Sequence, residues 1–368
     1  MKKPPASLVS PVLNLALLVG VSLSLTAAAQ APPTREVIRS PRVAAFYADR
    51  EKNIPPNVRA RLESLRAELA KTPAASFTIG YTTALDRPLE QLAGTRIPGD
   101  AIEKSFRQNQ LAAEALRIDA ADAERYKIPR PAPACQASTA AFDWRALKKV
   151  TRIKDQGGCG SCWDFAAMAA YESAYLIRNL LTIDASEQHA LDCSNAGSCA
   201  GGWYGPVWGW MHNTKLATGQ QLPYSAAAQS CPTSIAGNYL TVAWGFVTTQ
   251  NATPPVADLK QALCDHGPLA VAMQATPLFQ AYTGGVFNQP GIFGINHAVT
   301  IVGWDDSTQS WIVKNSWGTG WGEQGYFRIH YGSNSIGYAA AWVEAPSARY
   351  PFNPKILAQK SLFRLTPQ

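Results

Sequence analysis

Residues 154–166 read Lys-Asp-Gln-Gly-Gly-Cys-Gly-Ser-Cys-Trp-Asp-Phe-Ala, a glycine-rich turn that runs directly into an apolar stretch from Trp163 to Leu181. The apolar stretch predicts a helix, and the turn delivers Cys162 to its start. Free N–H groups at a helix N-terminus carry partial positive charge, so they favour a thiolate there and lower the pKa of the cysteine. Cys162 is therefore a candidate nucleophile.

A pair of cysteines spaced C-x-x-C, Cys159 and Cys162, is also typical of redox pairs, of half a zinc site and of ordinary buried cysteines. Two later stretches favour the nucleophile. His297 lies 135 residues after Cys162, and Asn315 lies 153 residues after it. A histidine and an asparagine at about these separations after a cysteine resemble the pattern of the papain family, in which they serve as the base and the orienting amide.

An ordered set of motifs from about Phe142 to Ala341 resembles the papain-like cysteine proteases, with a precursor segment in front. The ordered set is far more specific than any single motif. The resemblance implies an α+β fold of two lobes, a helical left lobe and an antiparallel β-barrel-like right lobe, with the active site between them. The motifs are Phe142-Asp143-Trp144-Arg145, Gln156 to Trp163, Ser186-Glu187-Gln188 to Asp192-Cys193, Cys199-Ala200-Gly201-Gly202, His297, and Asn315 to Gly322.

The resemblance also implies a role for each site residue. Cys162 is the thiolate nucleophile, His297 its imidazolium partner and Asn315 the amide that orients the imidazole, while Gln156 forms an oxyanion hole with the backbone N–H of Cys162. Trp317 shields the bond between His297 and Asn315 from water. No metal or organic cofactor is implied. The expected substrate-binding residues are Gly201, Gly202, Trp203, Tyr204, Asn296, Ala298 and Trp317.

Asp164 departs from the small residue expected beside this nucleophile. Two positions along a helix correspond to about 200 degrees of rotation, so its side chain is predicted to point away from that of Cys162. A carboxylate in a first helical turn is favourable in itself, and the residue is interpreted as structural. The remaining histidines are interpreted as surface or packing residues, because none lies in a matching motif: His189, His212, His266 and His330.

Seven cysteines indicate an oxidising compartment with three disulfides and one free thiol. The resemblance implies the pairs Cys159–Cys199 and Cys193–Cys231. It leaves Cys135 with Cys264, a pair that does not follow from the motifs. If Cys162 is the free thiol, the redox and zinc interpretations of the C-x-x-C pair both fail.

The net charge of +7 is carried mostly by the front third of the chain. Up to Ala134 the balance of basic over acidic residues is 19 − 13, or +6, and from Cys135 onward it is 14 − 13, or +1. The catalytic part has no basic run or stripe, which argues against nucleic-acid binding.

Polypeptide substrates and the chain's own precursor segment are the expected partners, and the protein is expected to be a monomer.

Residues 1–29 have the pattern of a secretory signal peptide. Lys2-Lys3 precede a short apolar run from Val12 to Leu25, and the stretch Ala27-Ala28-Ala29-Gln30-Ala31 predicts cleavage after Ala29. The run is short for a membrane span, so no stable anchor is expected after cleavage. This predicts a secreted or periplasmic protein; a lysosomal or vacuolar location is the alternative.

Residues 30–134 are interpreted as an inhibitory prosegment. An apolar stripe at Val58, Leu62, Leu65 and Leu69 predicts one helix between Pro55-Pro56 and Pro73. A capping-box pattern at 100–103 predicts a second helix through Leu116, with Ile102 and Phe106 on one side. The stretches 77–81 and 85–92 resemble the strand and short helix of papain-family prosegments, which block the cleft in the direction opposite to substrate.

This region departs from the family in lacking its long interspersed helix motif, so a plain accessory domain is the alternative. The proline-rich stretch 128–134 is the expected cleavage site. The catalytic domain is then 135–345, and the tail 346–368 resembles nothing that can be placed.

The catalytic part is predicted to begin helical and end in strands. A glycine- and tryptophan-rich loop is expected over 193–210 and a short helix around Val256 to Leu263. Strands are predicted at 269–273, 298–304, 311–314 and 326–329. A hairpin turn at 305–307 would bring Asn315 beside His297.

These observations predict a cysteine endopeptidase made as a zymogen. The stretch 231–242 leaves no room for a cleft-blocking insertion of the kind that the exopeptidase branch of the family carries. Two alternatives stay open: a non-catalytic relative that binds peptides, and an acyltransferase that uses the same Cys–His pair.

Overall fold

The computed structural model describes residues 41–72, 74–99, 101–128, 134–248, 252–289 and 291–357. The predicted signal peptide, residues 1–29, lies outside this range. None of the helices in the described part of the chain is long and apolar enough to cross a membrane.

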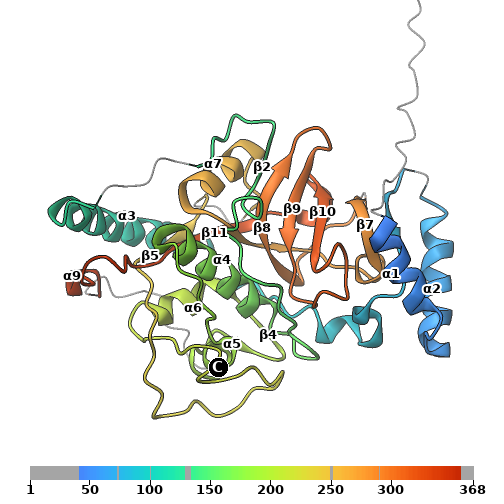
Figure 1. Cartoon of the computed structure of the whole chain (residues 1–368), viewed down its shortest axis with the longest axis horizontal. Coiled ribbons are helices and arrows are strands. Elements are labelled where there is room, and N and C mark those ends of the chain that lie inside the picture. Colours follow the sequence, from blue (N-terminus) through green and yellow to red (C-terminus); the bar gives the residue numbers. More distant parts are fainter. Residues whose placement is uncertain are drawn as a thin grey trace, which may run out of the picture. The chain divides into compact units, whose positions relative to one another are not determined.

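A nine-stranded sheet forms the right lobe, in the order β1-β7-β10-β9-β8-β6-β11-β5, with β2 paired to β8 (Figure 1). Neighbouring strands are antiparallel except for β7 and β10, which run parallel. The predicted α+β fold is confirmed. The strands are β1 (Ser76–Ile79), β2 (Ala141–Asp143), β5 (Ala243–Phe246), β6 (Leu269–Met273), β7 (Tyr282–Phe287), β8 (His297–Asp305), β9 (Ser310–Lys314), β10 (Tyr326–His330) and β11 (Tyr338–Glu344).

The hairpin of β8 and β9 carries the two right-lobe site residues. His297 opens β8, and Asn315 directly follows β9, whose last residue, Lys314, lies opposite Thr300. All residues of β8 except Asp305 are buried, because elements cover both faces of this central strand. This burial explains why β8 reads as a continuous apolar run rather than an alternating one.

The left lobe is built around α4 (Cys162–Asn179), which is accompanied by α5 (Glu187–Cys193) and α6 (Tyr204–Met211). Two short strands, β3 (Gly197–Ser198) and β4 (Gly201–Gly202), pair between α5 and α6. The loop predicted over 193–210 is therefore partly wrong, since Tyr204 begins a helix despite two glycines and a proline in it. Tight packing of its aromatic residues against α4 and β5 outweighs the low helix propensity of those residues.

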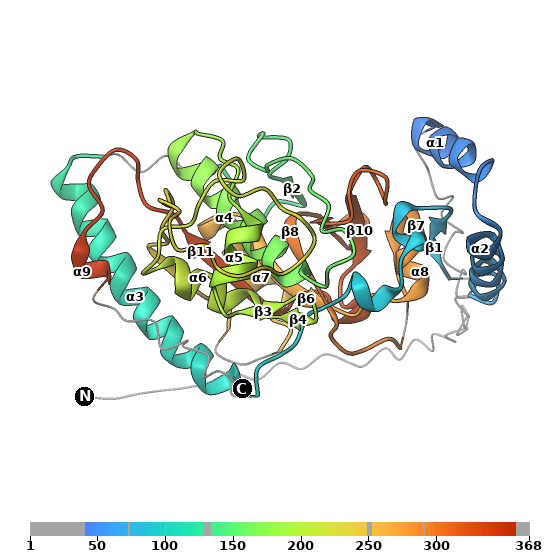
Figure 2. The same ribbon diagram turned by 90° about the horizontal axis from the view of Figure 1, so that it is seen from below.

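The residues before the catalytic part form α1 (Pro41–Glu51), α2 (Pro56–Leu69), β1, two short 3₁₀ helices, η1 (Thr83–Asp86) and η2 (Leu89–Gln91), and α3 (Ala101–Arg125). Both views show α1 and α2 beside β7, and α3 at the far side beside α9 (Pro354–Leu357) (Figures 1 and 2). Figure 1 also shows β5 next to α3. β1 extends the large sheet by pairing antiparallel with β7. The remaining helices are α7 (Val256–His266) and α8 (Pro277–Gln280), with a 3₁₀ turn, η3 (Ser333–Ser335), near β11.

Helix α2 buries Val58, Leu62 and Leu65, as the apolar stripe predicts. Helix α3 differs from its prediction, because it continues nine residues beyond Leu116 and its Phe106 is 52% exposed. Small and polar side chains form its buried face, so hydrophobic periodicity does not reveal it. The buried residues recur at spacings of three and four and are Ser105, Gln108, Ala112, Ala115, Asp119 and Asp122.

Three disulfides link Cys159 to Cys199, Cys193 to Cys231 and Cys135 to Cys264. Cys162 is a free thiol. These are the pairs that the sequence analysis names, and they leave Cys162 outside any redox pair with Cys159.

Candidate active site

The glycine-rich turn holds Cys162 at the first residue of α4. Gly157 has a φ of +63°, a conformation that favours glycine, and a Cβ at Gly160 would lie 2.6 Å from the carbonyl oxygen of Cys199. The N–H of Gly160 donates to that same carbonyl at 2.9 Å. The turn therefore requires glycine at these positions to place the thiol at the positive end of the helix.

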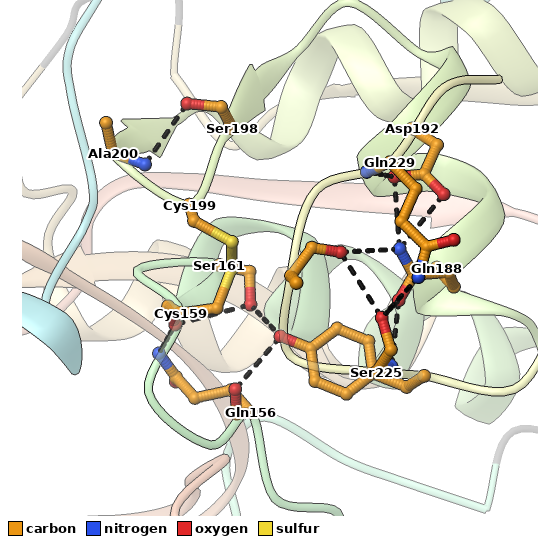
Figure 3. The surroundings of a disulfide bond; sticks show 12 residues. Gln156, Cys159, Ser161, Gln188, Asp192, Ser198, Cys199, Ala200, Ser225 and Gln229 are labelled. Carbon is orange, nitrogen blue, oxygen red and sulfur yellow. Dashed lines mark hydrogen bonds between the residues drawn. A yellow bond between two sulfur atoms is a disulfide. The ribbon is translucent and has the colours of Figure 1, made fainter.

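The disulfide between Cys159 and Cys199 ties this turn to the loop that carries β3 and β4 (Figure 3). Gln156 lies beside it, fully buried, and its Nε2 donates to the carbonyl oxygen of Cys159 at 2.8 Å. Ser316 Oγ donates to Gln156 Oε1 at 2.6 Å, which fixes the amide with its nitrogen toward the cleft. Ser316 thus orients Gln156, a contact that sequence reasoning did not assign although the residue lies within the Asn315 to Gly322 motif.

His297 faces the thiol from the right lobe and is held by Asn315. Nε2 of His297 and Oδ1 of Asn315 are 2.9 Å apart, and the amide oxygen also accepts the N–H of Ser316. The indole of Trp317 covers the imidazole, with ring centroids 4.7 Å apart. With Nε2 bonded to the amide oxygen, the Nδ1 atom of His297 makes no hydrogen bond in the described structure and is left for the thiol.

Two opposing influences set the pKa of Cys162. Burial, the larger, would raise it, but the nearby charge of His297, helped by contacts from Thr95 and Gly94, lowers the pKa to about 7. A substantial share of Cys162 is therefore thiolate near neutral pH. This is the ionisation state that a nucleophilic cysteine needs.

We expect the thiolate absorbance of Cys162 to rise with a midpoint near pH 7, and to be lost as the pH falls below it. In His297→Ala the midpoint should rise, because burial of the thiol remains and its main opposing charge is gone. Ultraviolet difference spectra against Cys162→Ala measure both midpoints. An unchanged midpoint in His297→Ala would contradict the pairing.

Asp164 is fully buried, and neither of its carboxyl oxygens makes a hydrogen bond in the part of the chain that the structure describes. Burial and the nearby charge of Glu187 raise its pKa well above the usual value. Burial therefore disfavours the charged form of Asp164, and this desolvation opposes the favourable interaction of a first-turn carboxylate with the helix dipole that the sequence predicted.

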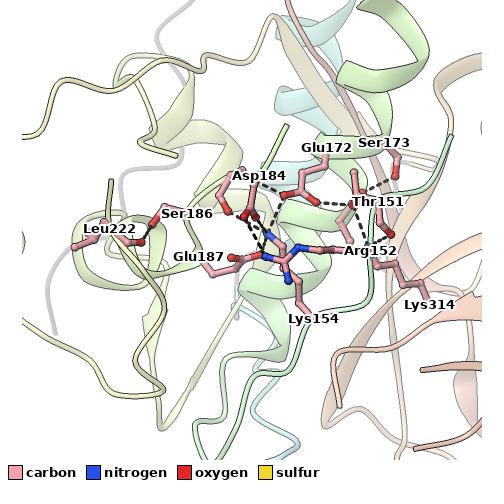
Figure 4. A network of polar contacts seen from close by, with 12 residues as sticks. Thr151, Arg152, Lys154, Glu172, Ser173, Asp184, Ser186, Glu187, Leu222 and Lys314 are labelled. Carbon is pink, nitrogen blue, oxygen red and sulfur yellow. Dashed lines mark hydrogen bonds and ion pairs between the residues drawn. The ribbon is translucent and has the colours of Figure 1, made fainter. Parts of the chain in front are cut away.

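A buried network of charges stands behind the site and joins the two lobes (Figure 4). Lys154 lies within 2.8 Å of a carboxylate oxygen of each of Glu172, Asp184 and Glu187. Lys314, at the end of β9, donates to the carbonyl oxygen of Thr151 at 3.0 Å, and the hydroxyl of Thr151 donates to Glu172 on α4. Burial lowers the pKa of Lys314 to about 8. Breaking one partner of such a network typically costs several kcal/mol.

The chain before the catalytic part occupies the cleft. The N–H of Gly94 lies 3.3 Å from Sγ of Cys162, and Oγ1 of Thr95 lies 3.2 Å from it. The backbone of Gly202 bonds this segment on both sides, donating to Gly94 at 2.8 Å and accepting from Arg96 at 2.9 Å. Thr95 pairs with Gly202 in parallel, and Cys162 is completely covered.

Leu92, two residues before Gly94, accepts hydrogen bonds from two side chains of the cleft. Its carbonyl oxygen accepts from Nε2 of Gln156 at 3.1 Å and from Nε1 of Trp317 at 3.3 Å. The side-chain donor assigned to the oxyanion hole is thus engaged by the chain's own backbone.

The other expected substrate-binding residues divide into two groups. The carbonyl oxygen of Asn296 accepts the N–H of Thr95 at 2.8 Å, so its backbone contacts the segment in the cleft. Ala298, Trp203 and Tyr204 lie in the buried cluster around α4, and the Tyr204 hydroxyl donates to the carbonyl of Ala339 at 2.6 Å. Gly201 is buried, and a Cβ there would lie 2.5 Å from the carbonyl oxygen of Gly94. That Trp203 and Tyr204 border a substrate pocket stays a prediction.

The four remaining histidines lie away from the thiol. His189 accepts the N–H of Ala217, and His212 is bonded to the carbonyl of Ile356. His266 pairs with Glu344, and His330 is bonded to the carbonyl of Tyr331. The cleft residues Gly94 and Thr95 carry no motif, and sequence reasoning did not find them.

The family model described as papain family cysteine protease matches residues 138–345. The chain is 38% identical over 194 residues to ananain of Ananas comosus, which covers 51% of this chain and 54% of that protein. It is 38% identical over 191 residues to stem bromelain of the same plant, covering 51% of this chain and 86% of that protein. The chain spans about half the length of the first curated relatives it matches.

Two solved precursor structures cover most of the chain. Procathepsin L2 from the larval midgut of Tenebrio molitor superimposes with a TM-score of 0.63 and 26% identity, covering 83% of this chain and 95% of that one. The recombinant stem bromelain precursor gives a TM-score of 0.60 and 26% identity, covering 83% and 98%. These likenesses extend upstream of the residues that the family model matches. The chain therefore belongs to the papain family of cysteine proteases and has the fold of its precursors.

Proposed function

We infer that this protein is a cysteine endopeptidase made as a zymogen, with residues 30–134 as the prosegment, residues 135–345 as the catalytic domain and a tail over 346–368. One observation carries the proposal: Gly94 and Thr95 cover the Cys162 thiol while His297, Asn315 and Gln156 already stand in working positions around it. The site needs the removal of its cover rather than any rearrangement of its own residues.

The reaction begins when the thiolate of Cys162 attacks the carbonyl carbon of a peptide bond. Gln156 Nε2 and the backbone N–H of Cys162 stabilise the negative oxygen of the tetrahedral intermediate. His297 gives its proton to the leaving amine, and the C–N bond breaks to leave a thioester on Cys162. His297 then takes a proton from water, whose oxygen attacks the thioester and releases the acid and the thiolate.

The direction of the covering segment supports inhibition rather than cleavage. Thr95 runs parallel to the Gly202 strand, whereas the resemblance implies that substrate lies in the opposite direction. The prosegment therefore acts as an intramolecular inhibitor and not as a substrate.

The absence of a blocking insertion favours an endopeptidase. Residues 231–242 form a short connection that leads directly from Cys231 to β5. The N-terminal pattern of residues 1–29 supports export, which makes the protein secreted or periplasmic. Polypeptides are the proposed substrates.

Product analysis tests the proposal. An added protease cuts the chain at the predicted cleavage site, 128–134, the segment that covers Cys162 is removed in mild acid, and a denatured polypeptide is supplied with and without a competing amine. We expect internal cleavage with new carboxyl termini in both cases, analysed by mass spectrometry. Products capped by the amine would instead indicate an acyltransferase. An uncleaved polypeptide would favour the alternative of a non-catalytic relative that binds peptides.

A further inference from the structure

The helix α3 is separate from the part of the prosegment that blocks the cleft. Residues 41–99, here called the inhibitory segment, pair with β7, bond Gln156 and cover Cys162. Between Gln108 and Arg125, the described side-chain hydrogen bonds of α3 reach β5, α4 and residues 350–353 or stay within the helix. Both views place α3 on the opposite side of the catalytic domain from α1 and α2 (Figures 1 and 2).

Helix α3 completes the open edge of the large sheet. β5 is the last strand, and the amide side chain of Asn109 bonds both backbone groups of Phe246, accepting its N–H at 2.8 Å and donating to its carbonyl at 3.0 Å. Gln108 donates to the carbonyl of Trp244 at 2.8 Å. These side chains bond backbone groups of β5 that a neighbouring strand would otherwise bond. Removing α3 would expose an unpaired edge, which proteins generally protect.

An ion pair fixes the other end of α3 to the central helix. Asp119 is 9% exposed, Arg178 near the end of α4 is 21% exposed, and the two side chains are 2.7 Å apart. Tyr350, beyond the catalytic domain, donates to Asp119 at 2.8 Å, and its ring stacks on Tyr126. Loss of α3 would leave the guanidinium of Arg178 half-buried and without its carboxylate, which is strongly destabilising.

The C-terminal tail closes over α3. Asn353 donates to Asp122 at 2.7 Å, and Ile356 in α9 is buried with its carbonyl bonded to His212. Residues 350–356 thus follow the catalytic domain in sequence and contact a helix that precedes it and the histidine of the left lobe. Such contacts on both sides of α3 are those of a helix that belongs to the folded catalytic domain.

The chain between the two parts is accessible. Ile97 is 38% exposed, Gly99 is exposed, and a Cβ at Gly99 would meet nothing within 4 Å. A cut there frees the inhibitory segment and leaves α3 joined to Cys135, which is linked to Cys264. We propose that activation cuts the chain at residues 97–99, and that α3 stays on the mature enzyme as a structural helix clamped by the C-terminal tail. This inference rests on the proposed zymogen and replaces 128–134 as the activating site.

The first test does not depend on activity. The full Cys162→Ala chain receives recognition sequences for an added protease both at 97–99 and at 129–133, is cut at both, and is passed through a sizing column in mild acid. We expect the peptide that ends in the 97–99 stretch to separate and the α3 peptide to elute with the catalytic domain. Separation of the α3 peptide as readily as the inhibitory peptide would overturn the proposal.

The second test uses the wild-type chain after maturation. Mass spectrometry should place its N-terminus within residues 97–101, and Asp119→Asn should lower the Tm of the mature enzyme by about 5–10 °C. Glu114→Gln is the matched control, because the Glu114–Arg117 pair lies exposed on the same helix and should change the Tm by no more than about 2 °C. A mature enzyme that begins near Ala134 and lacks α3, and whose Tm is the same with and without Asp119→Asn in the precursor, would contradict the inference. If the wild-type chain fails to mature, that result counts against the proposed function. The first test does not need maturation and still shows whether α3 stays with the catalytic domain.

Discussion

Replacing Cys162 or His297 with alanine is expected to lower kcat for peptide hydrolysis on the order of a millionfold once the inhibitory segment has been removed. Cys162→Ala removes the atom that forms the thioester, and His297→Ala removes both the proton donor and the charge that keeps the thiol ionised. Steady-state hydrolysis of a peptide substrate measures the loss. The double variant should be no slower than either single one, because the two groups act as a unit.

Folding of the two variants is checked independently of activity. Neither substitution touches a disulfide, since Cys162 is the free thiol. Both precursors should keep the three disulfides and the fold of the wild type by circular dichroism. Activity that survived in Cys162→Ala at more than about a thousandth of the wild type would assign the chemistry to another group.

Replacing Gly94 with alanine is expected to uncover the active site in the uncut precursor. A Cβ at Gly94 would lie 1.9 Å from the carbonyl oxygen of Gly160, whose own position is fixed against Cys199. The covering segment must therefore move and lose the bond from Gly202 to Gly94, along with its contact with Cys162. Two such bonds are worth about 1 kcal/mol each, which predicts a 10- to 100-fold faster reaction of the precursor with a thiol reagent.

Gly99→Ala is the matched control for this effect. It adds the same methyl group five residues further along, where the structure has open space. The labelling rate of its precursor should equal that of the wild type. Equal rates in Gly94→Ala and Gly99→Ala would mean that the close approach at Gly160 does not hold the segment in the cleft.

The site itself was predictable because its residues lie in short local motifs. Cys162 follows a turn whose glycines are needed for its backbone, and the hairpin between β8 and β9 brings His297 beside Asn315. The strands at 269–273 and 311–314 were predictable from apolar runs. The strands β5, β7 and β11 were not predicted, since glycine, alanine and tyrosine in them weaken the periodic signal.

The contacts of the prosegment were not predictable to the same extent. Gly94 and Thr95 reach Cys162 through tertiary contacts, in which the backbone of Gly202 and the carbonyl oxygen of Asn296 hold the segment in the cleft. Helix α3 buries alanine, glutamine and aspartate rather than leucine, so its face is invisible to a hydrophobic pattern. Asp164 was misread because helix position suggested an ion, whereas the surrounding burial favours the neutral acid.

Covalent labelling of Cys162 tests the zymogen proposal most directly. The wild-type precursor is treated with an epoxide thiol trap before and after cleavage at 97–99 and removal of the inhibitory segment, and the adducts are mapped by mass spectrometry with Cys162→Ala as the blank. We expect one adduct on Cys162 after removal of the segment and little or none before. Equal labelling in both states, or no adduct on Cys162 after the segment has left, would contradict the proposal.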